Sequence, residues 1–243
     1  MHEVYGLSDI GTIRQNNEDF FSCLHEQHFY ALADGMGGPN AGEVAAKETL
    51  LDICNAALKL REQIKDPRQL LLQLKDAIKD TNRHIHAMGE EHPAFQGMGT
   101  TLCCFFLHEK QLLFAHVGDS RLYRFSKGRL IRLTEDHSLK NKLIRSGELK
   151  RGELLPAPYS HVITKAIGPS GNVEPSINRS PIEDGDLIFM CSDGLSDYLP
   201  EAAIEGILKE QLSIKNTVDC LITSAKEHGS RDNITVLMVR YQP

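Results

Sequence analysis

The stretch Phe29-Tyr30-Ala31-Leu32-Ala33-Asp34-Gly35-Met36-Gly37-Gly38 runs from an apolar segment directly into an acid and a glycine-rich turn. The apolar run at 29–33 predicts a buried β-strand. Asp34 then stands at the solvent end of that strand, and the glycines after it let the backbone turn sharply and bring a carbonyl close to an ion. A carboxylate next to such a carbonyl is typical of a site for a hard cation, magnesium or manganese.

Other acidic segments, scattered over most of the chain, have a similar setting. Asp193-Gly194 repeats the arrangement after the apolar run 187–191, Asp232 precedes the last apolar run, and Glu18-Asp19 precede another. Asp119, in Val117-Gly118-Asp119-Ser120-Arg121, is a further candidate. A lone Asp-Gly pair is most often an Asx-turn. Several such acids meeting at one point would repel one another unless a cation held them, so the set predicts a metal site with oxygen ligands only.

Length and composition describe an ordinary globular protein. The chain has 243 residues, 41% of them hydrophobic and 25% charged, which predicts a single domain over residues 1–243 with a core that needs no disulfides. Its net charge of −6 argues against a general nucleic-acid binder. The six cysteines contain no C-x-x-C pair, and no stretch is apolar enough to span a bilayer. Reduced cysteines and the lack of a signal peptide predict a cytoplasmic protein that binds no membrane.

The spacing of apolar residues predicts groups of strands separated by helix pairs. Strands are expected at 4–10, 20–24, 29–33, 101–107, 112–117, 121–125, 129–133, 173–178, 187–191 and 234–241. Helices are expected at 44–58, 70–92, 201–209 and 217–227, with a small helix and a loop at 143–151. Hairpin-length turns between strands favour antiparallel sheets covered by helices, an α+β fold. The chain has neither G-x-G-x-x-G nor a Walker sequence, and no Rossmann-type alternation.

Arg14 precedes Glu18 by four residues and is a candidate phosphate clamp, because its planar guanidinium matches two phosphate oxygens. The competing interpretation is a solvated turn residue. His137, in Thr134-Glu135-Asp136-His137, is expected to pack and to form hydrogen bonds rather than bind a metal. No Ser stands in G-x-S-x-G and no Cys in a C-x5-R loop, so a covalent nucleophile is not indicated.

Taken together, these segments resemble the metal-dependent Ser/Thr protein phosphatases of the type 2C family, in their compact bacterial form. The resemblance covers essentially the whole chain, and its segments follow the order of that family: Ser8-Asp9-Ile10-Gly11 with Arg14 and Asn16-Asn17-Glu18-Asp19, Asp34-Gly35-Met36-Gly37-Gly38 with Gly42-Glu43, Gly99-Thr100-Thr101, Val117-Gly118-Asp119-Ser120-Arg121, Thr134-Glu135-Asp136-His137-Ser138, Ile163-Thr164-Lys165-Ala166-Ile167-Gly168, Ser192-Asp193-Gly194-Leu195 and Asp232-Asn233-Ile234-Thr235. It implies a four-layer α-β-β-α sandwich of two antiparallel sheets flanked by helix pairs. The resemblance also implies a small flap at residues 138–162 and a site in a cleft at one end of the sandwich.

The resemblance also implies the roles of the site residues. Asp34 bridges two divalent cations, Mn(II) or Mg(II); the Gly35 carbonyl binds one of them, and Asp193 and Asp232 bind the other. Glu18 and Asp19 hold metal-bound waters, Asp119 serves a weaker third cation together with Asp193, and Arg14 grips the phosphate. The implied reaction is hydrolysis of phosphoserine and phosphothreonine on proteins by a metal-activated water, without a phosphoenzyme. A monomer that reverses the action of a Ser/Thr protein kinase is expected.

Two positions depart from the family pattern. Met36 stands where animal members carry a His proposed as general acid, so the leaving alkoxide is expected to take its proton from a metal-bound water. Pro39 stands where many bacterial members have a His, and this difference is expected to change the shape of the loop rather than metal ligation.

Two other functions compete with an active phosphatase. A catalytically silent phosphoprotein-binding regulatory module on the same fold is opposed by the complete set of acids, and turnover of a small aryl phosphate with manganese separates the two. A calcium-binding structural domain would need EF-hand spacing, which the chain lacks. The irregular segment 143–159, with Lys150 and Arg151, is expected to touch the protein part of the substrate rather than its phosphate.

Overall fold

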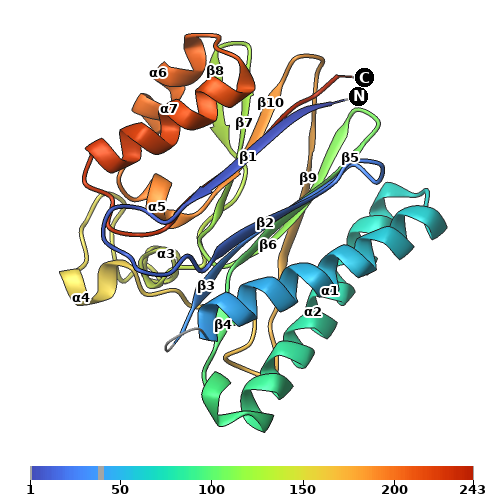
Figure 1. The fold of residues 1–243 in the computed structure, drawn as a ribbon, viewed down its shortest axis with the longest axis vertical. Helices are drawn as coiled ribbons and strands as arrows, with labels where there is room; N and C mark the ends of the chain where they lie inside the picture. The colour runs from blue at the N-terminus through green and yellow to red at the C-terminus, as the bar shows by residue number, and fades with distance from the viewer. Residues whose placement is uncertain (1, 38–40, 243) are drawn as a thin grey trace.

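The computed structural model describes residues 2–37 and 41–242. Gly38 and Pro39, two positions of the turn after Asp34, lie outside the described residues. Two antiparallel sheets stack face to face, and each carries a pair of helices on its outer surface (Figure 1). The predicted four-layer α-β-β-α sandwich is therefore confirmed. Among the helices of the described ranges, none combines the length and the hydrophobicity that a bilayer span needs.

The first sheet brings the two ends of the chain together. Its strands lie in the order β1 (Glu3–Asp9), β11 (Ile234–Arg240), β10 (Leu187–Cys191), β7 (Arg121–Ser126) and β8 (Arg129–Arg132). β1 pairs with β11 from Glu3 opposite Arg240 to Asp9 opposite Ile234. The helices α6 (Glu201–Lys209) and α7 (Ile214–Glu227) cover the outer face (Figure 1). The residues that α7 buries recur at helical spacing: Ile214, Thr217, Val218, Leu221, Ile222 and Ala225.

The second sheet carries the long helix pair. Its strands lie in the order β2 (Asp19–Leu24), β3 (Phe29–Met36), β5 (Leu102–His108), β6 (Gln111–Val117) and β9 (Ser176–Pro181), and the short β4 (Gly99–Thr100) pairs with the end of β3. The helices α1 (Ala41–Gln63) and α2 (Pro67–Glu91) cover it (Figure 1). Asp66 fixes the start of α2, because its Oδ1 accepts a hydrogen bond from the Gln69 amide at 2.7 Å and Pro67 occupies the first turn.

Both faces of β3 are buried, which explains its continuous apolar sequence. Phe29, Ala31 and Ala33 belong to the core under α1 and α2, whereas Tyr30 and Leu32 belong to the core between the two sheets. This alternation has the two-residue period of a β-strand. Cys104 and Cys103 divide between the same two cores, and all six cysteines are free thiols, as expected.

The bounds of several predicted elements differ from the observed ones, and two elements are displaced along the chain. The strand expected at 173–178 is β9 (Ser176–Pro181): Pro175 has no N–H for a sheet pair, and the strand continues at the sheet edge, where its polar residues conceal it. The small helix expected at 143–151 is α3 (Leu139–Ser146), because Ser138 caps its start and Gly147, with φ 81°, ends it. The short elements that were not predicted are η1 (Pro93–Phe95), β4 (Gly99–Thr100), α4 (Ala157–Ser160) and α5 (Asp193–Ser196).

The segment expected to form a flap, 138–162, leaves and rejoins the sandwich at one place. The Leu139 amide donates to the Val162 carbonyl at 2.7 Å, and the Thr164 amide donates to the His137 carbonyl at 2.7 Å. Between these bonds lie α3 and α4, beside the strand ends (Figure 1). The segment is therefore a loop-like insertion whose two ends are held together by backbone hydrogen bonds, next to the acidic residues.

The strands that carry the acidic segments end at one edge of the sandwich. Asp19 of β2 lies opposite Asp34 of β3, and Asp193 begins α5 directly after β10. α5 passes so close to the start of β11 that a Cβ added to Gly194 would lie 1.9 Å from the carbonyl oxygen of Asn233. A glycine after Asp193 is therefore a packing requirement, which brings the segments of Asp193 and Asp232 together.

We predict that Gly194→Ala lowers the free energy of unfolding by about 1–3 kcal/mol, because backbone must move to admit the methyl group. Gly206→Ala in α6 is the matched control: no atom lies within 4 Å of the added Cβ, and a helix-interior alanine should stabilise by about 0.5–1 kcal/mol. Urea unfolding of both variants measures the two effects. Equal stability of Gly194→Ala and the wild type would contradict the close approach.

Candidate active site

A cavity of ≈ 310 Å³ lies at the edge of the sandwich where these strands end. Its wall includes all but one of the residues that the sequence analysis assigned to the site: Arg14, Glu18, Asp34, Gly35, Asp119, Asp193 and Asp232. Asp19 lies behind this wall and is 2% exposed. A larger hollow of ≈ 610 Å³ lies at Glu109–Gln111 and Arg179–Pro181, far from any such set of acids. The chemistry of the lining, and not the volume, therefore marks the candidate site.

Asp34 is fixed through its backbone. Its amide donates to Thr101 Oγ1 at 3.0 Å, and its carbonyl accepts from the Thr101 amide and Thr100 Oγ1, both at 2.8 Å. Burial raises the pKa of the Asp34 carboxyl well above its ordinary value, and the neighbouring acids, Asp19 first, raise it further. The fold thus holds the Asp34 carboxylate at a position where its negative charge is unfavourable unless a cation lies nearby.

Asp19 is held from the first sheet. Ser192 Oγ donates to Asp19 Oδ2 at 2.7 Å, so the residue before Asp193 supports the acid of β2. Burial raises the pKa of Asp19 to about 6. This bond joins the two sheets at the bottom of the cavity.

Asp193 and Asp119 form the next part of the wall. Asp193 starts α5, and burial raises the pKa of its carboxyl well above the ordinary value, with Asp119 as the largest charge contribution. Asp119 follows β6 in a turn that is anchored by a hydrogen bond of 2.7 Å between Ser120 Oγ and Thr101 Oγ1. Burial, and then the charge of Asp136, raise the pKa of Asp119 to about 6. The two carboxylates are therefore close enough to feel each other's charge.

Asp232 is paired with Arg14. Arg14 Nη2 donates to Asp232 Oδ2 at 2.7 Å, and the Arg14 side chain is 51% exposed at the cavity mouth. The next residue, Asn233, joins the chain ends: its Nδ2 donates to the Ile10 carbonyl at 3.0 Å and the Asn16 carbonyl at 2.9 Å, and its Oδ1 accepts from the Glu18 amide at 2.9 Å. Asn233 therefore positions the loop that carries Arg14 and Glu18.

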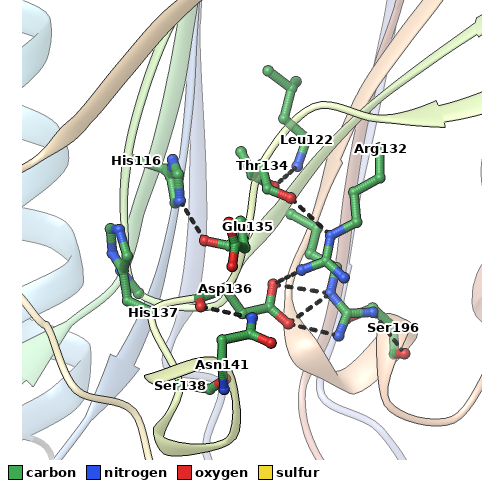
Figure 2. Close-up of polar contacts among 12 residues, drawn as sticks. His116, Leu122, Arg132, Thr134, Glu135, Asp136, His137, Ser138, Asn141 and Ser196 are labelled. Carbon is green, nitrogen blue, oxygen red and sulfur yellow. Dashed lines mark hydrogen bonds and ion pairs between the residues drawn. The ribbon is translucent and has the colours of Figure 1, made fainter. Parts of the chain in front are cut away.

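A charge network behind Asp119 ties the loop after β8 to α5. Figure 2 shows the Asp136 carboxylate facing the Arg132 guanidinium, which donates to it. Arg121 donates to the same carboxylate through Nε at 3.1 Å and Nη2 at 2.8 Å, and its Nη1 donates to the Ser196 carbonyl at 3.1 Å. Since Ser196 ends α5, this network holds the helix that begins at Asp193. Sequence reasoning missed this role, because Asp136 and Ser196 are distant in the chain.

His137 packs and forms hydrogen bonds, as predicted. Its Nδ1 accepts from the Gly118 amide at 3.1 Å, and its Nε2 lies 2.8 Å from Ser176 Oγ. It stacks on His116, with ring centroids 4.5 Å apart. Burial lowers the pKa of His137 to about 3, so the ring is neutral at physiological pH and supports the turn that carries Asp119.

The donor set fits a hard divalent cation. Every candidate ligand is a carboxylate or a carbonyl, and burial together with mutual repulsion opposes their charge. In residues 2–37 and 41–242, no three His, Cys, Asp or Glu side chains already converge on one ion position. Arg14 and Ser192 hold two of the carboxylates instead. The residues present suit the ion chemically, and binding it means that these side chains readjust.

Comparison with known proteins decides the family. The family model described as Protein phosphatase 2C matches residues 12–227. This chain belongs to the protein phosphatase 2C family. It is 36% identical over 242 residues to a serine/threonine phosphatase of Listeria welshimeri, covering 98% of this chain and 95% of that protein. The structure of the S. agalactiae serine/threonine phosphatase superposes with a TM-score of 0.91 at 34% identity and full coverage of both chains.

A further solved relative carries metal ions. The catalytic domain of the serine/threonine protein phosphatase PstP in complex with two manganese ions superposes with a TM-score of 0.82 at 32% identity, covering 98% of this chain and 97% of that one. The resemblance to the type 2C family is thus confirmed at the level of sequence and of fold.

The cavity also has lining residues that sequence reasoning did not assign to the site. His161 and Ile163 face it, and His161 Nδ1 lies 2.8 Å from Asp197 Oδ2. Met36 lines the cavity as well. No residue of 143–159 does so among the described lining residues. That segment was expected to touch the protein part of the substrate rather than its phosphate, and this stays a prediction. The flap therefore meets the cavity near its end, at His161, and the connection that follows it meets the cavity at Ile163.

We predict that Asp136→Ala destabilises the fold by about 3–5 kcal/mol. Two poorly exposed arginines lose the carboxylate nearest to them, and Arg121 keeps only Asp197 Oδ1, at 3.9 Å. Glu135→Ala is the control next to it: Glu135 and its partner Arg145 are 55% and 65% exposed, so the loss should be at most about 1 kcal/mol. Chemical unfolding of the two variants compares them. Similar losses for both would show that Asp136 does not hold the network.

We also predict that divalent metal stabilises the protein. At a free cation concentration of 100 times the dissociation constant, the free energy of unfolding should rise by about 2.7 kcal/mol, because the crowded carboxylates bind the cation only in the folded state. Melting curves with manganese and with chelator measure the difference. Superimposable curves would contradict a site for divalent cations.

Proposed function

We propose that this chain is a metal-dependent protein phosphatase that hydrolyses phosphoserine and phosphothreonine on proteins. The observation that carries the proposal is that seven residues assigned from sequence line one cavity in a chain of the protein phosphatase 2C family. The relatives compared above are named serine/threonine phosphatases. The whole chain, residues 1–243, is proposed to act as a single catalytic domain.

The proposed cofactors are two divalent cations, Mn(II) or Mg(II), as in the manganese complex of the PstP catalytic domain. Asp34 is proposed to bridge them, with the Gly35 carbonyl on one ion and Asp193 and Asp232 on the other. Glu18 and Asp19 would hold waters around the ions, and Asp119 with Asp193 would hold a weaker third. When bound, the ions supply an activated water and neutralise charge on the phosphate.

The protein's own residues supply orientation. Thr100 and Thr101 hold the Asp34 backbone, and Ser192 holds Asp19, so the acids keep their places at the bottom of the cavity. Arg14 stands at the mouth, where its guanidinium has N–H groups besides the one on Asp232 to offer a phosphate oxygen. Met36 lines the wall and has no proton to donate. The leaving serine oxygen is proposed to take its proton from water instead.

The biological setting proposed is that of a signalling enzyme. Its substrates are phosphorylated proteins, a cognate Ser/Thr kinase adds the phosphates that it removes, and it works as a cytoplasmic monomer. A catalytically silent phosphoprotein-binding module is not favoured, because no acid of the expected set is missing from the cavity and the layer behind it.

We expect Asp34→Ala to abolish nearly all turnover of a small aryl phosphate with manganese present. The substitution removes the proposed bridging ligand, whereas Asp76→Ala, an exposed acid of α2, should leave activity unchanged. Steady-state kinetics of purified, folded variants test this. Retention of more than about a tenth of wild-type turnover, only about 1.4 kcal/mol of barrier, would rule out the bridging role.

Arg14→Ala should mainly weaken binding of the phosphate ester. A charge-assisted hydrogen bond is worth roughly 1.5–3 kcal/mol, so the Michaelis constant should rise about tenfold or more. Manganese affinity, measured by titration calorimetry, should not fall, because the substitution removes no proposed ligand and frees Asp232 from its ion pair. Arg68→Ala serves as an exposed control. An unchanged Michaelis constant and turnover would remove Arg14 from the site.

A further inference from the structure

A second hollow, of ≈ 420 Å³, opens directly beside the candidate active site. The two share Met36 and Ile163 as lining residues, so they lie side by side. Apart from Met36, the hollow is built by the connection 163–174 between the flap and β9. A substrate chain that leaves the cavity on this side would pass over this surface.

The floor of the hollow is held in one shape. Ile167 exchanges two backbone hydrogen bonds with Thr100, at 3.0 and 2.9 Å. The fully buried Asn82 of α2 accepts from the Gly168 amide at 2.9 Å and donates to the Ser170 carbonyl at 2.9 Å. An irregular connection with this many fixed points does not need to fold upon binding, so it offers a preformed surface.

The lining of the hollow combines apolar side chains with a cation. Ile163, Ala166, Pro169 and Val173 line the hollow together with Lys165. Lys165 Nζ donates to the Glu174 carbonyl at 2.9 Å, which leaves further N–H groups of the ammonium for a ligand.

A third hollow, of ≈ 300 Å³, adjoins the second on the side of α3 and adds positive charge. It shares Thr164 and Lys165 with the second hollow, and Lys142 and Arg145 also line it.

The nearby acids do not cancel this charge. The Glu174 carboxylate forms ion pairs with Lys75 and Lys79, and Glu135 forms one with Arg145. Asp136 is bound by Arg121 and Arg132. Over the described part of the chain, Lys142 and Lys165 have no carboxylate within ion-pair distance. These two ammonium groups beside the site have no ion pair of their own among the described residues, in a chain of net charge −6.

We propose that the hollow formed by 163–174 binds the substrate chain next to the phosphorylated residue, and that Lys165 with Lys142 selects an acidic side chain there. This rests on the proposed phosphatase function and names the class of protein substrate: phosphosites with an Asp or Glu close by on one side. Contact with the protein part of the substrate is thus assigned to the segment after the flap rather than to 143–159.

The test uses phosphoserine peptides that differ only by Asp, Ala or Lys at single positions up to three residues on either side of the phosphoserine. With the manganese-loaded wild type, kcat/KM should favour Asp over Lys by about fivefold or more at a position on one side. The double variant Lys142→Met/Lys165→Met should bring that ratio close to one, and turnover of a small aryl phosphate should stay at the wild-type level. Lys165→Glu should reverse the preference.

Lys59→Met, an exposed lysine of α1 away from the hollow, is the matched control and should keep the wild-type ratio. Equal kcat/KM for the Asp, Ala and Lys peptides would overturn the inference while leaving the phosphatase function intact. An acidic preference that persists in the double variant would overturn it as well. Failure to hydrolyse both the peptides and the aryl phosphate would overturn the proposed function itself.

Discussion

Repulsion among buried carboxylates is the constraint on which this structure depends. Asp34, Asp19 and Asp193 stand at strand ends where burial and neighbouring acids oppose their charge. Such an arrangement survives only if the fold holds each acid from behind. Thr100 and Thr101 do this for Asp34, Ser192 for Asp19, and the network of Arg121 and Asp136 for the helix that starts at Asp193.

The sandwich architecture is what brings the acids together. Asp19, Asp34 and Asp119 come from strand ends of the second sheet, and Asp193 and Asp232 come from those of the first. The apolar layer between the sheets, with Tyr30 and Leu32 on one side and Met190 and Leu237 on the other, fixes how the two edges meet. The positions of the acids relative to one another therefore depend on how the core packs the two sheets together. A change that loosens this core would also displace the ligands.

The sequence predicted the elements and site residues whose signals are local. Asp34 and Asp193 stood out because each follows a buried strand and precedes a glycine. Strand groups and helix pairs predicted antiparallel sheets covered by helices, and the resemblance to the type 2C family added their four-layer arrangement. Signals that depend on remote partners were missed: Arg14 pairs with Asp232 at a separation of 218 residues, and His161 with Asp197 at 36. β9 was misplaced because Pro175 and an exposed edge conceal its pattern. The Asp136 network was invisible because its arginines come from β7 and β8 and its anchor from α5.

The central claim is that the acids of this cavity hold a pair of divalent cations bridged by Asp34. Anomalous diffraction from crystals of the wild-type protein grown with manganese tests it most directly. The account predicts two strong anomalous peaks in the cavity, both within ligand distance of Asp34, with Asp193 and Asp232 beside one of them. Ordered manganese elsewhere, or no anomalous density among these carboxylates, would contradict it.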